Sequence, residues 1–511
     1  MPNHSLSPST ALYSIAEIRA IEHAAQAALP PFTLMSRAGA AAARLARQLA
    51  GNSGDGILFL AGPGNNGGDA LEASYCLARE GLPASVLLFA DPARQTSDTR
   101  QALLHAQSAG VRFADPARWP EVLNERWALV VDGLFGIGLA RPIDDKLRPL
   151  VTTVNALPWP VLALDVPSGF DADTGTIVGP DGVAVRASHT ITFIGNKPGL
   201  HTGYGRDHAG TVLVDTLDIN AALFQPAAMQ LNGVGAFAAC LRARDQNTHK
   251  GSFGDVTIAG GARGMAGAVI LAARAAARCG AGRVFAAFLG EAPAYDSLQP
   301  ELMCRAAAEH DFGTGAVVAG PGLGTSPQAH ELLMRVLAAQ NPLILDADAL
   351  NLIASEQGLR HRLTQRQGST MITPHPLEAA RLLGTSSARV QSDRIAAARE
   401  LADGLRAVTV LKGSGTAIAL PNGRVYVNTT GNPALATAGT GDVLAGMCGA
   451  LLAQGWPAPQ AACGAVWLHG RAADMLVDQG QGPIGLVASE LLSEVRKALN
   501  QLVREHGRAS A

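Results

Sequence analysis

The stretch GILFLAGPGNNGGDA, residues 56–70, decides the fold of the first half of the chain. Its apolar run GILFLA is typical of a buried strand in a parallel sheet. The glycines that follow predict a tight turn between this strand and a helix. A backbone without side chains can approach a phosphate at such a turn, and the amides at the start of the helix can bind it. The stretch therefore predicts an anion or nucleotide site on an α/β fold.

This stretch leaves two interpretations open. It contains G-x-G-x-x-G, and Asp91 follows the next apolar run at roughly the spacing of a ribose-binding acid, which indicates a Rossmann dinucleotide site. The alternative is a purely structural glycine-rich turn in which Asp69 caps the N-terminus of the helix. The motif alone does not decide between them.

Further apolar runs recur along the chain in the spacing of βαβ units, which predicts two α/β domains. Amphipathic helices are expected at residues 15–29 and 34–50, and a linker from about Asp218 to Gly235. The strands expected in the first half are 56–62, 84–90, 127–133, 160–166, 190–195 and 211–216. The second half is expected to hold a helix at 266–280 and strands at 253–261, 283–289, 315–320, 342–347, 369–374, 407–413 and 425–429.

The composition excludes several classes of protein. The chain has 511 residues, of which 48% are hydrophobic and 16% charged, so general disorder is excluded. Forty Lys+Arg against 42 Asp+Glu give a formal charge of -2, so neither a nucleic-acid partner nor an acidic membrane surface is expected. Six cysteines form no C-x-x-C pair, and the first ten residues show no basic and apolar leader. We therefore expect a cytoplasmic protein with reduced thiols and a small-molecule ligand.

Acidic turns end two later strands of the first half, VVDGLFGIG with Asp132 and LDVPSG with Asp165. The carboxyl ends of parallel strands meet in one crevice, so these turns should converge on the glycine-rich turn. Asn66, Asp132 and Ser168 could supply oxygen ligands, and so few charges favour a monovalent or loosely held cation over Zn²⁺. Asp165 would then be free for proton transfer. Each acid taken singly could instead cap a turn.

The segment GTGD, residues 439–442, precedes a long apolar stretch that predicts a helix. Its backbone N–H groups could form an anion hole for a transferring phosphoryl group, with Asp442 placed to take a hydroxyl proton. An ordinary helix start is the alternative. Lys250 and Lys412 could both be solvated loop cations, and only Lys412, inside K-G-S-G-T, has a motif-level link to phosphate.

GNNGGD, VDGLFGIGL, DVPSGFDADTG and LMSRAG resemble the N-terminal, NAD(P)HX epimerase domain of the bifunctional NAD(P)H-hydrate repair enzymes. The resemblance implies interconversion of the R and S hydrates, for which we expect Asp165 to serve as general acid and base. It also implies that Asn66, Asp132 and Ser168 bind K⁺. The implied NAD(P)HX contacts are Asn65, Asn66, Gly67, Gly68, Asp69, Gly136, Ile137, Gly138, Leu139, Ala140, Arg141, Pro142 and Asp165.

HKGSFGDVTIAGG, GPGLG, LDADALN, TPHPLE, LKGSGT and GNPALATAGTGDVLAG occur in the order of ribokinase-like folds and resemble the ADP/ATP-dependent NAD(P)HX dehydratases. Together the two resemblances imply an α/β chain with a Rossmann-like three-layer epimerase domain at residues 1–225 and a ribokinase-like dehydratase domain at residues 230–505. They imply dehydration of S-NAD(P)HX with ADP as co-substrate and Mg²⁺ as cofactor, AMP and phosphate being released.

The resemblance in the second half also implies site residues. Asp442 would be the catalytic base, and His375 stands where kinases of this fold usually have the Asn of N-x-x-E, with Glu378 supporting the metal. A neutral imidazole there could hydrogen-bond the nicotinamide, or it could be a structural histidine. The implied hydrate contacts are Ala268, Gly322 or Gly324, His375 and Asp442. The implied ADP/AMP contacts are Lys412, Gly413, Ser414, Gly415, Thr416 and Gly441.

Three other functions remain as alternatives. A ribokinase-like small-molecule kinase with an accessory nucleotide-binding domain would release a stable phosphorylated product, and His375 disfavours it. A dehydrogenase built on GPGNNG is disfavoured by the Asn/Asp-rich turn, and a non-catalytic nucleotide sensor by the retention of Asp165, Asp442 and Lys412. The sequence leaves the choice between NADHX and NADPHX, and assembly into a homo-oligomer, undecided.

Overall fold

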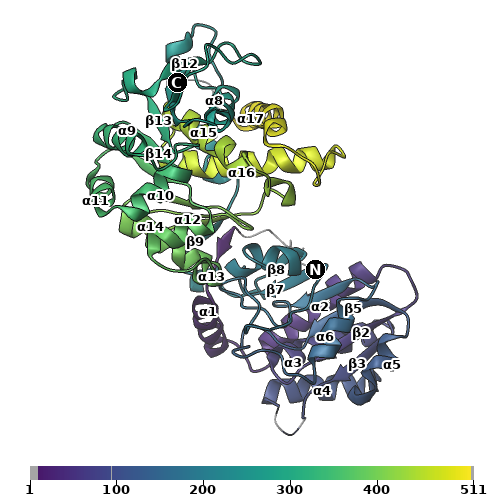
Figure 1. Ribbon diagram of the computed structural model, residues 1–511. Helices are drawn as coiled ribbons and strands as arrows, with labels where there is room; N and C mark the ends of the chain where they lie inside the picture. Colours follow the sequence, from purple (N-terminus) through teal and green to yellow (C-terminus); the bar gives the residue numbers. More distant parts are fainter. Residues whose placement is uncertain (1–9, 92, 94, 508–511) are drawn as a thin grey trace. The chain divides into compact units, whose positions relative to one another are not determined.

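The computed structural model describes residues 10–91, 93 and 95–507, and the chain divides into two compact units, Met1–Gln230 and Leu231–Ala511 (Figure 1). The division falls inside the segment 218–235 that the sequence predicts as a linker. This segment is not featureless, because it holds the 3₁₀ turn Ala221–Leu223 and the strand β9, Met229–Asn232. Met229 of β9 pairs antiparallel with Leu12 of β1, Ala11–Leu12, so backbone pairing orders a stretch that has no hydrophobic periodicity.

A seven-stranded parallel sheet forms the centre of the first unit, in the order β4-β3-β2-β5-β6-β7-β8. Six of these strands are predicted by the sequence. The seventh, β4, is a short edge strand whose side chains are half-buried or exposed, so it gives no apolar run. The strands are β2 Gly56–Ala61, β3 Ala84–Leu88, β4 Arg112–Ala114, β5 Trp127–Gly133, β6 Val161–Leu164, β7 His189–Phe193 and β8 Thr211–Asp215.

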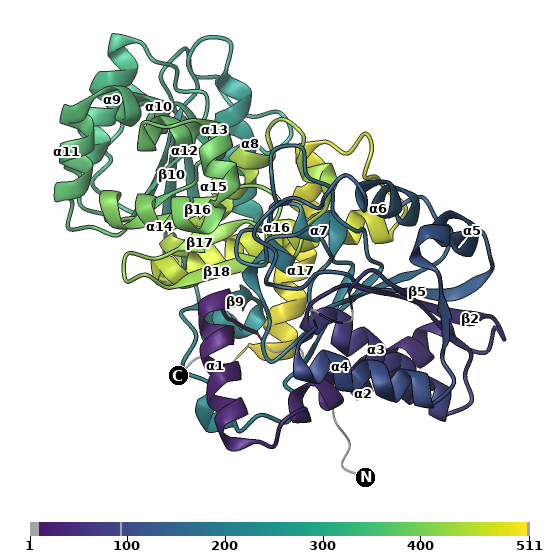
Figure 2. The ribbon, with the colours of Figure 1, turned by 90° about the horizontal axis from the view of Figure 1, so that it is seen from below.

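Helices cover both faces of this sheet, which gives the expected three layers (Figure 2). Successive residues of a strand point to opposite faces, so Phe59 packs under α1–α4 while Leu58 and Leu60 pack under α5 and α6. The helices are α1 Ile15–Ala28, α2 Thr33–Ala50, α3 Asn65–Arg79, α4 Ser97–Ser108, α5 Trp119–Leu123, α6 Arg148–Val154 and α7 Gly205–His208.

The second unit contains a larger sheet in the order β18-β17-β16-β15-β14-β13-β10-β11-β12. Strands from β12 to β16 run parallel, and β17 and β18 are antiparallel additions after β16. The short strands β12 and β17 are missed by the sequence prediction. The strands are β10 Asp255–Gly260, β11 Arg283–Phe288, β12 Met303–Ala306, β13 Ala316–Ala319, β14 Leu343–Leu345, β15 Thr370–Ile372, β16 Val408–Leu411, β17 Ala417–Ala419 and β18 Val425–Asn428.

Two groups of helices pack on this second sheet, as Figure 1 shows. One group supplies the alanine-rich core under the sheet: α8 Ala266–Arg278, α15 Thr440–Ala453, α16 Ala458–Asp478 and α17 Leu491–His506. The other group is α9 Pro327–Ala338, α10 Ala347–Ser355, α11 Gln357–Gln365, α12 Pro376–Leu383, α13 Ser387–Ser392 and α14 Arg394–Leu405. Within the described part of the chain, no helix combines the length and apolar character that crossing a membrane requires.

Candidate active sites

A cavity of about 730 Å³ opens at the carboxyl ends of β2, β5 and β6 in the first unit. Its walls come from the start of α3, the loop that follows β5, the turn after β6 and one face of α1. The sequence contains no motif that predicts a site on α1, yet Arg19, Glu22 and Gln26 of this helix line the cavity. Most of the predicted substrate residues also line it: Asn65, Asn66, Asp69, Gly136, Ile137, Gly138, Leu139, Ala140, Arg141 and Asp165.

Three predicted contacts lie behind the cavity wall instead. Gly67 and Gly68 belong to the first turn of α3 rather than to the turn before it, and both are buried. A Cβ on Gly67 would lie 2.0 Å from the carbonyl oxygen of Gly62, and one on Gly68 would lie 2.5 Å from Met35 Cε. Gly67 is thus required for the close packing of α3 on the backbone, whereas a side chain at position 68 would require the Met35 side chain to move. Pro142 similarly packs behind the loop, within 2.3 Å of the position that a Cβ on Gly179 would take.

The structure corrects both interpretations of the glycine-rich turn. Asp69 does not cap α3, because the helix begins at Asn65, four residues earlier, and the Asp69 side chain lines the cavity. Asp91 is exposed, accepts the backbone N–H of Ala93 at 3.0 Å and is not among the cavity residues. Asp91 therefore does not occupy the place of a Rossmann ribose-binding acid.

Asn66, Asp132 and Ser168 are a group of three buried polar residues, located in the first turn of α3, at the end of β5 and in the turn after β6. The Ser168 hydroxyl donates to Asp132 Oδ1 at 2.6 Å, and the Ser168 backbone N–H donates to Oδ2 at 2.8 Å. Burial raises the pKa of Asp132 to about 6, and no cationic side chain among the described residues pairs with its carboxylate. Neither amide atom of the buried Asn66 side chain has a hydrogen-bond partner. An oxygen-preferring cation would complete this group.

The sequence predicts a free Asp165, but in the structure its carboxylate forms an ion pair with Lys197. The Lys197 ammonium is fully buried and donates to Asp165 Oδ1 at 2.7 Å, to Thr192 Oγ1 at 2.6 Å and to the Phe193 carbonyl at 3.0 Å. Asp165 has a φ of 64°, a conformation that costs about 1 kcal/mol or more for a residue with a side chain. The fold therefore holds this carboxylate in one orientation, facing the cavity.

Two further acids share the cavity with Asp165. Desolvation raises the pKa of Asp69 well above its ordinary range, and the negative charge of Asp165 raises it further. Glu22 of α1 also has a raised pKa, first because of burial and then because of Asp165. The cavity thus combines a lysine-paired carboxylate with two carboxyl groups that hold a proton more readily than free side chains do.

In the second unit, the predicted catalytic Asp442 lies in the first turn of α15. The sequence predicts that GTGD precedes this helix, but three of its four residues belong to the helix. Gly439, with a φ of 89°, is the N-cap, and Thr440 is the first helical residue. Lys412 follows β16, and its Nζ is 3.3 Å from the position that a Cβ on Gly441 would take. The ammonium and the amide end of α15 therefore lie side by side, an arrangement suited to an anion.

Asp346, which sequence analysis did not single out, completes this arrangement. It follows β14, is 2% exposed and accepts hydrogen bonds from Lys412 Nζ and Thr373 Oγ1, both at 2.8 Å. Burial raises the pKa of Asp442 to about 7, and the charge of Asp346 adds to this while Lys412 opposes it. The segment LDADALN at the end of a predicted strand is the signal that could have revealed Asp346.

His375 is the N-cap of α12. Its Nδ1 accepts the Leu377 backbone N–H at 3.1 Å, and Nε2 lies 3.3 Å from Glu378 Oε1. Partial burial and the charge of Lys412 lower the pKa of His375, so the neutral ring predominates at pH 7. The structural role that the sequence left open is therefore present, and 46% of the His375 side chain remains exposed to solvent.

The remaining predicted residues lie at the same edge of the second sheet. Gly322 and Gly324 follow β13 with positive φ, and a Cβ on Gly322 would lie 3.3 Å from Ala268 Cβ in the first turn of α8. The loop from Lys412 to Thr416 is supported by Arg394, which is 2% exposed and donates to the Lys412 carbonyl at 3.0 Å. The sequence did not predict a role for Arg394 either, because this residue begins α14 and belongs to no motif.

Known proteins match both halves of the chain. Residues 31–199 match the family model described as YjeF-related protein N-terminus, and residues 256–497 match the model described as NAD(P)H-hydrate dehydratase. A crystal structure of the ADP/ATP-dependent NAD(P)H-hydrate dehydratase from Bacillus subtilis, co-crystallised with ATP and Mg²⁺, matches with 31% identity and a TM-score of 0.47. The match covers 53% of this chain and 98% of that chain.

Two curated relatives extend over nearly the whole chain. The bifunctional NAD(P)H-hydrate repair enzyme Nnr of Coxiella burnetii is 38% identical over 504 residues, covering 96% of this chain and 100% of the relative. The enzyme of the same name from Escherichia coli strain K12 is 36% identical over 491 residues, covering 93% and 90%. On this similarity over both units, the chain belongs to the family of bifunctional NAD(P)H-hydrate repair enzymes.

Proposed function

We propose that the cavity of the first unit binds the hydrated nicotinamide nucleotide and interconverts its R and S forms. The observation that carries this proposal is the Asp165–Lys197 pair at the wall of a cavity large enough for a nucleotide. The hydrate carries a hydroxyl on carbon 6, next to the ring nitrogen, so loss of that hydroxyl leaves a cation that the nitrogen stabilises. Water can then add to either face of the ring.

Proton transfer in this exchange is assigned to Asp165, with Lys197 as a positioning residue. The departing hydroxyl takes a proton and leaves as water, and the incoming water gives a proton back, so the reaction needs no net acid. Asp69 is the neighbouring carboxyl from which the proton can be replenished, because its raised pKa keeps it protonated beyond the range of a free side chain. Gly136–Arg141 would hold the nucleotide beside these acids.

The group Asn66, Asp132 and Ser168 fits K⁺. A buried amide without a partner and a buried carboxylate without a cationic partner both gain from a weakly held cation that takes oxygen ligands. K⁺ would supply the positive charge that keeps Asp132 ionised. Asp132 in turn orients Ser168, whose hydroxyl accepts the backbone N–H of Phe135 at 2.8 Å and so fixes the loop over the cavity.

We also propose that the second unit dehydrates S-NAD(P)HX at Asp442, with ADP as co-substrate. Asp442 takes the proton of the carbon 6 hydroxyl, and the oxygen forms a bond to the terminal phosphoryl group of ADP as AMP leaves. Lys412 and the amide of Gly441 stabilise the charge on that group. The carbon–oxygen bond of the phosphate ester then breaks, phosphate leaves with the electron pair, and loss of a proton from carbon 5 restores NAD(P)H.

Mg²⁺ fits beside this site because it is usually bound by one or two carboxylates together with phosphate oxygens. Asp346 and Glu378 are buried carboxyl groups next to Lys412, and burial raises the pKa of Glu378. They would hold the ion, which would neutralise charge on the phosphates of ADP. Within the described residues, no cluster of three or more His, Cys, Asp or Glu side chains forms a metal cage.

The assignment to the two units, residues 1–225 for the epimerase and 230–505 for the dehydratase, is part of the proposal, and so is a cytoplasmic location. All six cysteines are unpaired in the structure, which supports a reducing compartment. His375 and Ala268 are proposed to contact the hydrate, and the loop from Lys412 to Thr416 the adenine nucleotide.

Single substitutions test the two sites separately in the full chain. Asp165→Asn should lower the rate of R/S interconversion, measured by chromatography of the two hydrates, by about 10²-fold or more while dehydration of the S form persists. Asp442→Asn should have the opposite pattern. Asp91→Asn and Asp403→Asn are matched controls, because both carboxyl groups lie outside the proposed sites. Full interconversion by Asp165→Asn would overturn the assignment.

A further inference from the structure

The second unit has a cavity away from Asp442, at the amino ends of β10 and β11, which we call the second cavity. The parallel strands place Lys412 and Asp442 at the carboxyl ends, so this cavity is at the opposite edge of the same sheet. Its volume is about 500 Å³, within the usual range for a small-molecule site. The helix α8 runs from Ala268 at one edge to Arg278 at the other.

Positive charge is concentrated in this second cavity. Four cationic side chains line it, Lys250, Arg278, Arg283 and Arg496, against the single carboxylate of Glu301. Arg283 is already paired with Asp255 through two hydrogen bonds. The other three form no ion pair and no side-chain hydrogen bond among the described residues. Such a concentration is notable in a chain whose formal charge is -2, because unpaired cations around a concave surface attract anions.

A buried polar side chain points to a ligand independently of the charge. Gln299 lines the cavity and is 5% exposed, yet no group among the described residues hydrogen-bonds to its side-chain amide. The amide nitrogen and oxygen of Gln299 are not fully enclosed by protein, so both are open to a ligand or to water. The Gln299 amide and the guanidinium groups of Arg278 and Arg496 together offer several N–H donors.

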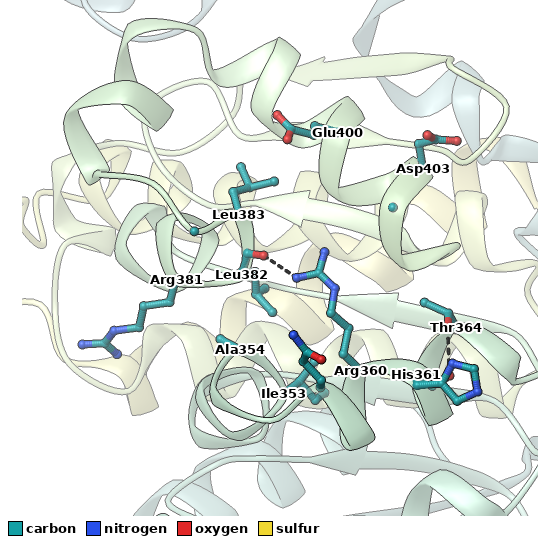
Figure 3. A pocket seen from close by; sticks show the side chains of 13 residues that line it. Ile353, Ala354, Arg360, His361, Thr364, Arg381, Leu382, Leu383, Glu400 and Asp403 are labelled. Atoms are coloured by element: carbon teal, nitrogen blue, oxygen red, sulfur yellow. Dashed lines mark hydrogen bonds between the residues drawn. The ribbon is translucent and has the colours of Figure 1, made fainter.

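Another hollow of the same unit shows the difference that charge balance makes (Figure 3). It is lined by Arg360 and Arg381, but Glu400 and Asp403 of α14 also line it. Arg360 donates to the Leu382 carbonyl at 2.7 Å, so its donors are partly used by the fold. That hollow has no excess of unpaired cations to select an anion.

We propose that the cavity at the amino ends of β10 and β11 binds a phosphorylated small molecule, at a site distinct from the one that holds ADP. Guanidinium groups match phosphate oxygens in pairs, and the Gln299 amide can bind a further oxygen. A volume of about 500 Å³ accommodates a compact phosphate or diphosphate group. Lys250, which the HKGSFGD motif leaves without a role, would be one of its ligands.

Hydrogen exchange of the full chain, followed by mass spectrometry, tests this proposal with sodium pyrophosphate as the probe. ADP is present throughout to occupy the catalytic anion hole. Pyrophosphate should protect amides at the end of α8 and in the segment 299–303. The variant Arg278→Ala/Arg496→Ala should need about tenfold more probe for the same protection, equivalent to about 1.4 kcal/mol. Both side chains are at least partly exposed, so the variant should fold.

Two control variants separate this site from general charge effects. Arg362→Ala removes an exposed arginine of α11 that is outside the cavity, and it should bind the probe like the wild type. Arg278→Lys/Arg496→Lys keeps the charge and should retain most of the protection. The proposal is overturned if Arg278→Ala/Arg496→Ala is protected as well as the wild type, or if sodium chloride of equal ionic strength gives the same protection.

Discussion

Asp442→Asn should stabilise the second unit although it abolishes dehydration. The carboxyl is enclosed at the start of α15, and burial is the largest cause of its raised pKa, followed by the charge of Asp346. Ionised Asp442 is therefore less favourable in the folded protein than in the unfolded chain. Asparagine has nearly the same shape and carries no charge, so it removes this penalty.

The size of the effect follows from the pKa of Asp442, which rises from an ordinary 3.8 to about 7. At 1.36 kcal/mol for each pH unit, this corresponds to about 4 kcal/mol. Partial solvent contact reduces the figure, and a negative charge in the first turn of α15 returns about 0.5 kcal/mol through the helix dipole. We expect a net gain of about 2 kcal/mol for Asp442→Asn.

The stability difference between Asp442→Asn and the wild type depends on pH. Below pH 3.8 the carboxyl is protonated in both states and adds no penalty, whereas above about pH 7 it is ionised in both and the penalty is complete. The advantage of Asp442→Asn should therefore grow between these limits. Hydrogen exchange of buried amides in α15 and α16 at pH 8 and pH 5 measures it in the full chain. Equal or lower protection of the variant at pH 8 would refute the reasoning.

Three further changes have expected outcomes. Lys197→Met leaves Asp165, whose side chain is only 14% exposed, without its cation and should destabilise the first unit by about 2–4 kcal/mol, measured by urea denaturation. A smaller loss in Asp165→Asn/Lys197→Met than the sum of the single losses would confirm the coupling. Asp132→Asn should abolish the dependence of the epimerase rate on K⁺ concentration, and an unchanged K⁺ titration would contradict the proposed ligand set. Gly67→Ala should destabilise the first unit by about 1–3 kcal/mol, because its Cβ would lie 2.0 Å from the Gly62 carbonyl oxygen, and an unchanged melting temperature would show that α3 can shift.

The sequence predicts the sheets well because buried parallel strands leave long apolar runs. It misses β1, β4, β9, β12 and β17, which are all short and include edge strands, so little in their composition separates them from loops. Gly67 marks a close approach of backbones, which a phosphate site and a packed helix both require. Sequence alone does not separate these two causes.

The candidate sites are predicted in part for a related reason. Asp132 lies at the carboxyl end of β5 and Asp442 in the first turn of α15, so topology brings each to the ligand edge of its sheet. Lys197 and Asp346 each form an ion pair with a site residue, Asp165 and Lys412 respectively, and each partner lies far away in the sequence. Arg394 supports a loop from the first turn of α14, a role that depends on tertiary packing alone.

The most direct measurement starts from the pure R hydrate of NADH, with ADP, Mg²⁺ and K⁺, and follows the near-ultraviolet absorbance of the reduced nicotinamide. The wild type should restore NADH completely. Asp165→Asn alone should restore it only as fast as the hydrates interconvert spontaneously, and Asp442→Asn alone should not restore it. A mixture of the two variants should again restore NADH, because each supplies the site that the other lacks. Restoration by Asp165→Asn at the wild-type rate, or failure of the mixture, would contradict a division of the two reactions between Asp165 and Asp442.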